Sequence, residues 1–183
     1  MGSMTRFLVS LFLLVLSAPT CTIAQESGGT DDAAILSTVV QSMCLGLATH
    51  GEKRYIVLSD RSEEIGRDGG KEGLNRDALA SLVARNSLSH QLPKITLCSS
   101  VKVFKRDDIR AAENKFVSDD FLSDFRKAFP GSFGPTTLSL PGYAEGGTSA
   151  LVVMSNAGGS FYYVLRRVDG KWRVDKSVFR SIA

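Results

Sequence analysis

The sequence predicts an α+β domain, in which helices from the first two thirds of the chain pack on a curved antiparallel sheet formed mainly by the last third. Apolar residues recur at helical spacing in three segments before residue 130. Four β-rich segments follow, separated by Gly-rich turns. Helices first and strands last are typical of α+β folds. The hydrophobic content of 43% and the charged content of 22% are those of a globular protein.

The first helix is expected over residues 32–49, where apolar residues recur every three or four positions. These are Leu36, Val40, Met43 and Leu47. A short strand is expected over Tyr55 to Leu58, because YIVL is apolar and rich in β-formers. A second helix is expected from Asn75, a residue type that caps helix N-termini, toward Asn86.

Between these elements, residues 60–73 carry four glycines and eight charges, which predicts a mobile surface loop. One or two strands are expected over residues 94–105. A third helix is expected from Ser118 to Phe129 and places three phenylalanines on one face. They are Phe121, Phe125 and Phe129.

The last third predicts four strands, over residues 136–140, 149–155, 160–168 and 171–179. Asp169-Gly170 is a strong signal for a two-residue hairpin, which would pair Val168 with Lys171 and Arg167 with Trp172. Alternation then predicts a core face and a half-exposed face. The expected core face is Phe161, Tyr163, Leu165, Arg167, Trp172, Val174 and Val178, and the expected half-exposed face is Tyr162, Val164, Arg166, Lys171, Arg173, Asp175 and Ser177.

The first 24 residues predict export. Arg6 precedes the apolar run from Phe7 to Leu16, and small residues at Thr22 and Ala24 form a cleavage site before Gln25. The run is too short for a membrane span, which needs about 20 apolar residues. We therefore expect a signal peptide over 1–24, a single domain over 25–183 and a periplasmic or secreted location.

Cysteine usage agrees with an oxidising compartment. Cleavage after Ala24 removes Cys21 and leaves Cys44 and Cys98, which we expect to form a disulfide, although two buried free thiols are the alternative. A lipid anchor at Cys21 is disfavoured because Pro19 and Thr20 fit a lipidation motif poorly.

The closing segment from Phe161 to Val174 (FYYVLRRVDGKWRV) resembles the final hairpin of NTF2-like domains, in which a strand opening with Trp follows a Gly turn. The element order, with a long first helix and a terminal strand meander, is also similar. The resemblance implies a curved sheet around a conical pocket. That family includes isomerases, dehydratases and binding domains, so it does not fix a function.

Candidate binding residues gather on the predicted last hairpin: Arg166, Lys171, Trp172 and Arg173. Such a basic face suits an anionic ligand or an acidic partner, whereas its structural alternative is a solvated sheet face with Arg167 stacked on Trp172. The formal net charge of +3 is too small to indicate a nucleic-acid binder. The only two histidines, His50 and His90, form no ligand pattern, so no metal, cofactor or catalytic residue is expected.

The sequence favours an exported, non-catalytic domain that binds a protein partner or a small ligand, with inhibitor and immunity proteins as one subclass. An NTF2-like enzyme is the first alternative; it would need an aromatic pocket and a buried acid such as Asp60 or Asp175. A structural protein of the envelope is the second.

Overall fold

The computed structural model describes residues 28–49, 53–66, 73–115 and 121–181. The helices are α1 (Gly28–Thr49), α2 (Arg76–Arg85), α3 (Arg106–Lys115), α4 (Phe121–Ala128) and a 3-10 turn, η1 (Glu145–Gly147). The strands are β1 (Tyr55–Ser59), β2 (Val101–Phe104), β3 (Ser132–Leu138), β4 (Gly142–Tyr143), β5 (Ser149–Asn156), β6 (Gly159–Val168) and β7 (Lys171–Ser181). The predicted α+β class is confirmed. The predicted leader, residues 1–24, lies outside the described residues and stays a prediction.

These strands form one sheet in the order β2-β1-β3-β5-β6-β7, with β4 paired to β5. The sheet is mixed, because β1 pairs in parallel with both β2 and β3, whereas β3, β5, β6 and β7 pair antiparallel. The expectation of an antiparallel sheet therefore holds only for the C-terminal strands. Parallel strands need a crossover connection, and α3 and α4 supply the one between β2 and β3.

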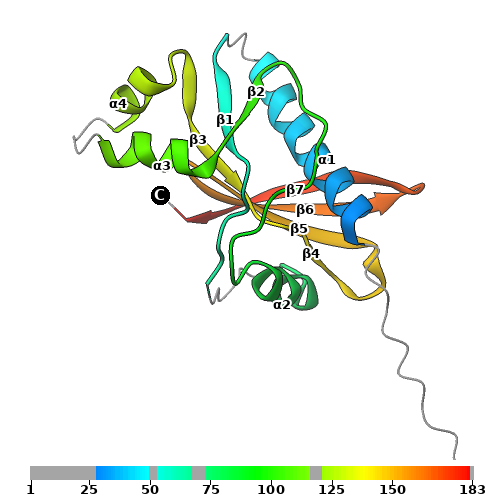
Figure 1. Ribbon diagram of the computed structural model, residues 1–183. Coiled ribbons are helices and arrows are strands. Elements are labelled where there is room, and N and C mark those ends of the chain that lie inside the picture. Colours follow the sequence, from blue (N-terminus) through cyan, green and yellow to red (C-terminus); the bar gives the residue numbers. More distant parts are fainter. Residues whose placement is uncertain (1–27, 50–52, 67–72, 116–120, 182–183) are drawn as a thin grey trace, which may run out of the picture.

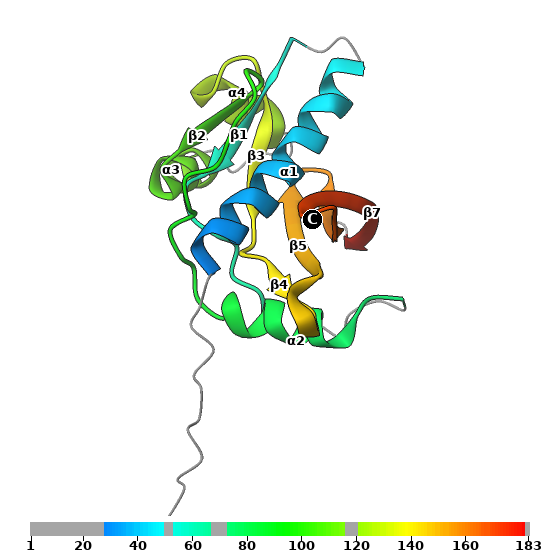
Figure 2. The ribbon, with the colours of Figure 1, turned by 90° about the vertical axis from the view of Figure 1, so that its right-hand side faces the viewer.

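Helices cover both faces of the sheet (Figures 1 and 2). On one face, α1 belongs to a core cluster to which β1, β2, β3, β5, β6 and β7 all contribute side chains. On the opposite face, α2 packs on β5 and β6 around Tyr162. The helices α3 and α4 pack beside it on Val57 of β1. Tyr162 is fully buried, so the second hairpin face is partly a core face, which corrects the half-exposed expectation.

The helix α3 was not predicted, because its sequence RDDIRAAENK is mostly charged and buries only Ile109 and Ala112. In the segment 94–105, a strand forms only over Val101–Phe104, while Ile95 and Cys98 pack against the α1 core as irregular chain. The helix expected from Ser118 is described over Phe121–Ala128, and Ser118 itself lies outside the described residues.

The loop predicted over residues 60–73 is partly packed. Ser62 is fully buried and Ile65 is 2% exposed, because Ile65 lies in the α2 core. Glu63 N–H donates to the Leu138 carbonyl and Ile65 N–H to the Asn86 carbonyl. Because of this burial and these hydrogen bonds, the first part of the segment is not a mobile surface loop. The many charged residues of the segment gave no sign of this packing. Residues 67–72 are not described.

The last hairpin has the predicted turn register, with Val168 opposite Lys171 and Arg167 opposite Trp172. Farther along, two register shifts between β6 and β7 move the partner residues, so that Val178 lies opposite Tyr162. Val178 therefore packs in the α2 core and not with Phe161 and Tyr163, which corrects its predicted face.

The predicted disulfide is present. Cys44 of α1 and Cys98, in the irregular chain before β2, are bonded, with their Cα atoms 6.5 Å apart. The bond ties the second half of α1 to the chain that enters β2. It therefore fixes one wall of the pocket described next.

Candidate functional site

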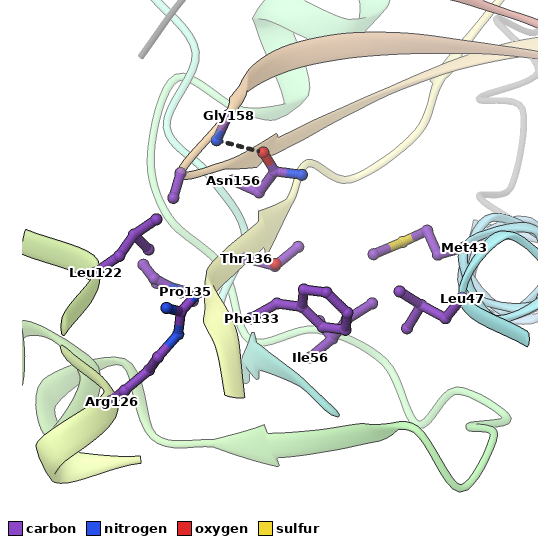
Figure 3. A pocket seen from close by; sticks show the side chains of 12 residues that line it. Met43, Leu47, Ile56, Leu122, Arg126, Phe133, Pro135, Thr136, Asn156 and Gly158 are labelled. Carbon is purple, nitrogen blue, oxygen red and sulfur yellow. Dashed lines mark hydrogen bonds between the residues drawn. The ribbon is translucent and has the colours of Figure 1, made fainter. Parts of the chain in front are cut away.

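A pocket of about 340 Å³ lies at the edge of β3, between α1, α4 and the turn that joins β5 to β6 (Figure 3). This volume is at the lower end of the range for small-molecule sites, about 300–1,000 Å³. We call it the edge pocket. Its described lining residues are Met43, Leu47, Ile56, Leu122, Arg126, Phe133, Gly134, Pro135, Thr136, Asn156, Ala157 and Gly158.

The pocket forms where β3 extends beyond the residues that pair with β5. Only Thr136, Thr137 and Leu138 pair with β5, ending at Asn156. In the part of the chain that the structure describes, the first half of β3 has a strand neighbour only on its β1 side. A register irregularity, in which Tyr55 faces Ser132 but Val57 faces Pro135, adds one residue to β3 at this point.

Gly134 keeps the floor of the pocket open. A Cβ atom at this position would lie 3.0 Å from Leu122 Cδ2 and 3.5 Å from Ala157 Cβ, so α4 and the β5–β6 turn approach the bare backbone from two sides. Its φ of 144° is also unfavourable for other residues. A glycine is therefore favoured here mainly by conformation, and a Cβ atom would in addition require Leu122 to shift slightly.

Apolar side chains form most of the walls. Figure 3 shows Met43 and Leu47 of α1 on one side of β3 and Leu122 of α4 on the other. Phe133 and Ile56 lie between them, with the hydroxyl of Thr136 nearby. Such a lining favours a ligand with an apolar body.

Two polar side chains from opposite elements reach the pocket. The half-buried Arg126 of α4 donates from Nε to the Ser132 carbonyl at 3.1 Å, which orients its guanidinium group along β3. Asn156, at the end of β5, accepts the Gly158 N–H on Oδ1 at 2.8 Å. That bond leaves the Asn156 amide nitrogen as the free donor of the side chain.

The hairpin residues predicted as a binding set do not lie together. Arg166 and Arg173 are cross-strand neighbours and exposed, as is Lys171. Trp172 is 7% exposed and packs on the opposite side, in the α1 core, where its ring lies 6.3 Å from the Tyr143 ring. The Arg167 guanidinium lies 5.8 Å from the Trp172 ring centroid, as expected for a cation–π pair.

The two acids of the enzymatic alternative lie away from the edge pocket. Asp60 lines a second pocket of about 430 Å³ beside β2 and accepts the Arg106 backbone N–H at 2.9 Å, at the start of α3. Asp175 is exposed, lies 3.2 Å from Arg166 and lines a polar pocket of about 530 Å³. Each of these carboxylates therefore already interacts with a group of the protein, Asp60 with the Arg106 backbone and Asp175 with the Arg166 side chain.

A buried charged cluster joins α1, α2 and β4. Asp32, the fifth residue of α1, receives two hydrogen bonds from Arg85 and one from the Tyr143 hydroxyl. Burial raises the pKa of Tyr143 above its usual range, and the bond to Asp32 raises it further. The cluster fixes where α1 begins on the sheet; its residues do not line the edge pocket.

The residues that line the edge pocket were not predicted as a site. The available signal for the site was the pair Gly134 and Pro135 in β3, because glycine and proline are unusual inside a strand and indicate an edge or an irregularity. Within residues 28–49, 53–66, 73–115 and 121–181, no group of three or more His, Cys, Asp or Glu side chains is arranged to hold a metal ion. None of the described helices is long and apolar enough to cross a membrane.

Comparison with known proteins adds no relative: no family model, no curated protein and no solved structure gives a significant match to this chain.

Proposed function

We propose that this protein is an exported, non-catalytic binding domain that holds a small molecule in the edge pocket. The observation that carries the proposal is the open half of β3, where apolar walls and an oriented arginine surround about 340 Å³ of space. The Cys44–Cys98 disulfide supports export, because such bonds persist in oxidising compartments. The signal peptide over 1–24 and the periplasmic or secreted location remain part of the proposal.

A small ligand is favoured over a protein partner that binds the last hairpin. The basic side chains there include Arg166, which Asp175 partly neutralises, and Trp172, the aromatic side chain of the predicted binding set, is turned into the core. Aromatic anchors are what hot spots in protein interfaces usually contain. An inhibitor or immunity role and a structural role in the envelope rest on the predicted export alone.

A binding role is also favoured over the NTF2-like enzyme. None of the described lining residues of the edge pocket is a carboxylate or a histidine, the usual general acids and bases. The resemblance to NTF2-like domains in the final hairpin and element order stays a prediction.

The test is a fragment screen by ligand-observed NMR, with neutral and anionic fragments, on three proteins. Ala157→Leu extends an exposed side chain at the pocket wall, whereas Ala111→Leu makes the same change at an exposed position on α3. We expect fragments that bind the wild type and Ala111→Leu but not Ala157→Leu. Fragments that bind all three equally, or no binding fragment at all, would overturn the proposal.

A further inference from the structure

The edge pocket presents hydrogen-bond donors and a positive charge to its contents. Arg126 is the one charged side chain among its described lining residues. A guanidinium group has only donors, and its Nε–H is already used by the Ser132 carbonyl, which leaves the two terminal nitrogens for another acceptor. Asn156 likewise has its oxygen occupied and its NH₂ group available.

Arg126 lacks an acidic partner among the described residues, in contrast to five other arginines of the chain. A carboxylate oxygen lies within 4.0 Å of the guanidinium groups of Arg85, Arg106, Arg166, Arg167 and Arg180. Among the described residues, no carboxylate is that close to Arg126. A half-buried charge without a counter-ion is costly, so this site gains from an anion brought by a ligand.

A second arginine lies beside the same wall. The Arg54 guanidinium lies over the Phe133 ring, 4.3 Å from its centroid, and Phe133 is a lining residue. None of the described lining residues of the edge pocket is acidic. The field in this partly enclosed space therefore favours a negative group.

The remaining walls limit how polar the ligand can be. Met43, Leu47 and Ile56 come from one side of the sheet and Leu122 and Pro135 from the other, and all are apolar. A volume of about 340 Å³ equals that of roughly ten water molecules, so there is room for one anionic group and a short apolar body.

Resting on the proposed function, we infer that the ligand is a small monocarboxylate with an apolar body. Its carboxylate accepts hydrogen bonds from the terminal nitrogens of Arg126, which match a carboxylate in a bidentate geometry. Its apolar body lies against Phe133 and the side chains of α1.

Calorimetric titration with octanoate and with 1-octanol tests this inference, because the two probes share an apolar chain and differ in charge. We expect wild type to bind octanoate at least about tenfold more tightly than octanol. Arg126→Gln should remove that preference and leave octanol binding almost unchanged. Arg126→Lys keeps the positive charge but loses the bidentate donor geometry of the guanidinium group, so it should retain part of the preference for octanoate. Arg173→Gln, which removes an exposed arginine outside the pocket, should behave as wild type.

The outcomes separate the two proposals. If both probes bind equally and Ala157→Leu removes both, the small-molecule function stands and the carboxylate inference is wrong. A charge preference that persists in Arg126→Gln but disappears in Arg173→Gln would also overturn the inference and place the anion on the last hairpin. If neither probe binds and the fragment screen is empty, the proposed function itself fails.

Discussion

The Arg85 guanidinium makes a two-point contact with Asp32: Nη1 donates to Oδ1 at 3.0 Å and Nη2 to Oδ2 at 2.7 Å. Asp32 is 6% exposed, and the Tyr143 hydroxyl donates to its Oδ1 at 2.6 Å. Arg85 Nη1 also donates to the Pro141 carbonyl at 2.6 Å. One carboxylate thus joins α1 to α2, which packs on the opposite face of the sheet, and to β4, which pairs with β5.

Asp32→Asn should lower the free energy of unfolding by about 2–4 kcal/mol, because it leaves a half-buried guanidinium without its counter-charge. The matched control is Asp31→Asn, since Asp31 lies 3.5 Å from the exposed Arg167 and surface ion pairs contribute only about 0–1 kcal/mol. Urea unfolding with the disulfide intact measures both. Equal effects of the two changes would contradict the structural role of the cluster.

The raised pKa of Tyr143 predicts a loss of stability in alkali. Unfolded tyrosine titrates near pH 10, whereas the folded protein keeps Tyr143 protonated to higher pH. Above about pH 10 the unfolded state therefore binds fewer protons than the folded state, so the free energy of unfolding falls as pH rises. Below about pH 10 this residue contributes no pH dependence.

Tyr143→Phe removes this contribution, so the alkaline loss of stability measured by urea unfolding between pH 8 and 11 should be shallower than in wild type. It should not vanish, because burial also raises the pKa of Tyr163. An identical pH profile in the variant would show that Tyr143 titrates normally.

Gly142 is expected to tolerate no side chain, because a Cβ atom there would overlap the backbone of Ala78 and Leu82 in α2. Gly142→Ala should therefore cost roughly 3 kcal/mol or more by forcing α2 away from β4. Gly46→Ala is the control: a Cβ atom on that part of α1 meets nothing within 4 Å, so it should stabilise the helix by about 0.5–1 kcal/mol. Thermal unfolding should show shifts of opposite sign.

The disulfide closes a loop across 54 positions, from Cys44 to Cys98. In the chain-entropy model, such a loop contributes about 4 kcal/mol to stability. Replacing both cysteines by alanine should lower the free energy of unfolding by about that amount. It should also weaken octanoate binding, because Met43 and Leu47 flank Cys44 on α1. Intact mass before and after reduction and alkylation provides the control; free thiols in the unreduced protein would refute the bond.

Local sequence patterns predicted the C-terminal half of the fold well. Asp169-Gly170 fixed the hairpin register, and the strand at Ser149–Asn156 was expected within one residue. The disulfide was predicted from export and cysteine number. Apolar spacing did not predict α3, because a helix that buries only Ile109 and Ala112 has almost no apolar periodicity. The parallel pairing of β1 is a long-range choice that no local signal specifies.

The candidate site was harder to predict than the fold. In the sequence, Arg126 is one of several charged residues on a helix. Its proposed role in ligand binding depends on the absence of a nearby carboxylate among the described residues and on its hydrogen bond to the Ser132 carbonyl. Both depend on how the chain folds. Gly134 and Pro135 lie before the strand expected at 136–140, whereas β3 begins at Ser132 and includes both. Alternation placed Trp172 on the core face and Lys171 and Arg173 on the other, which is confirmed, so Trp172 cannot join these two side chains in one binding surface.

The most direct test of the edge pocket is a map of octanoate on the ¹⁵N-labelled protein by amide chemical shifts. We predict the largest shifts at the backbone amides of Gly134, Ala157 and Gly158, with saturation, and no comparable shifts along Arg166 to Arg173. Shifts centred on the last hairpin, or none that saturate, would contradict the account.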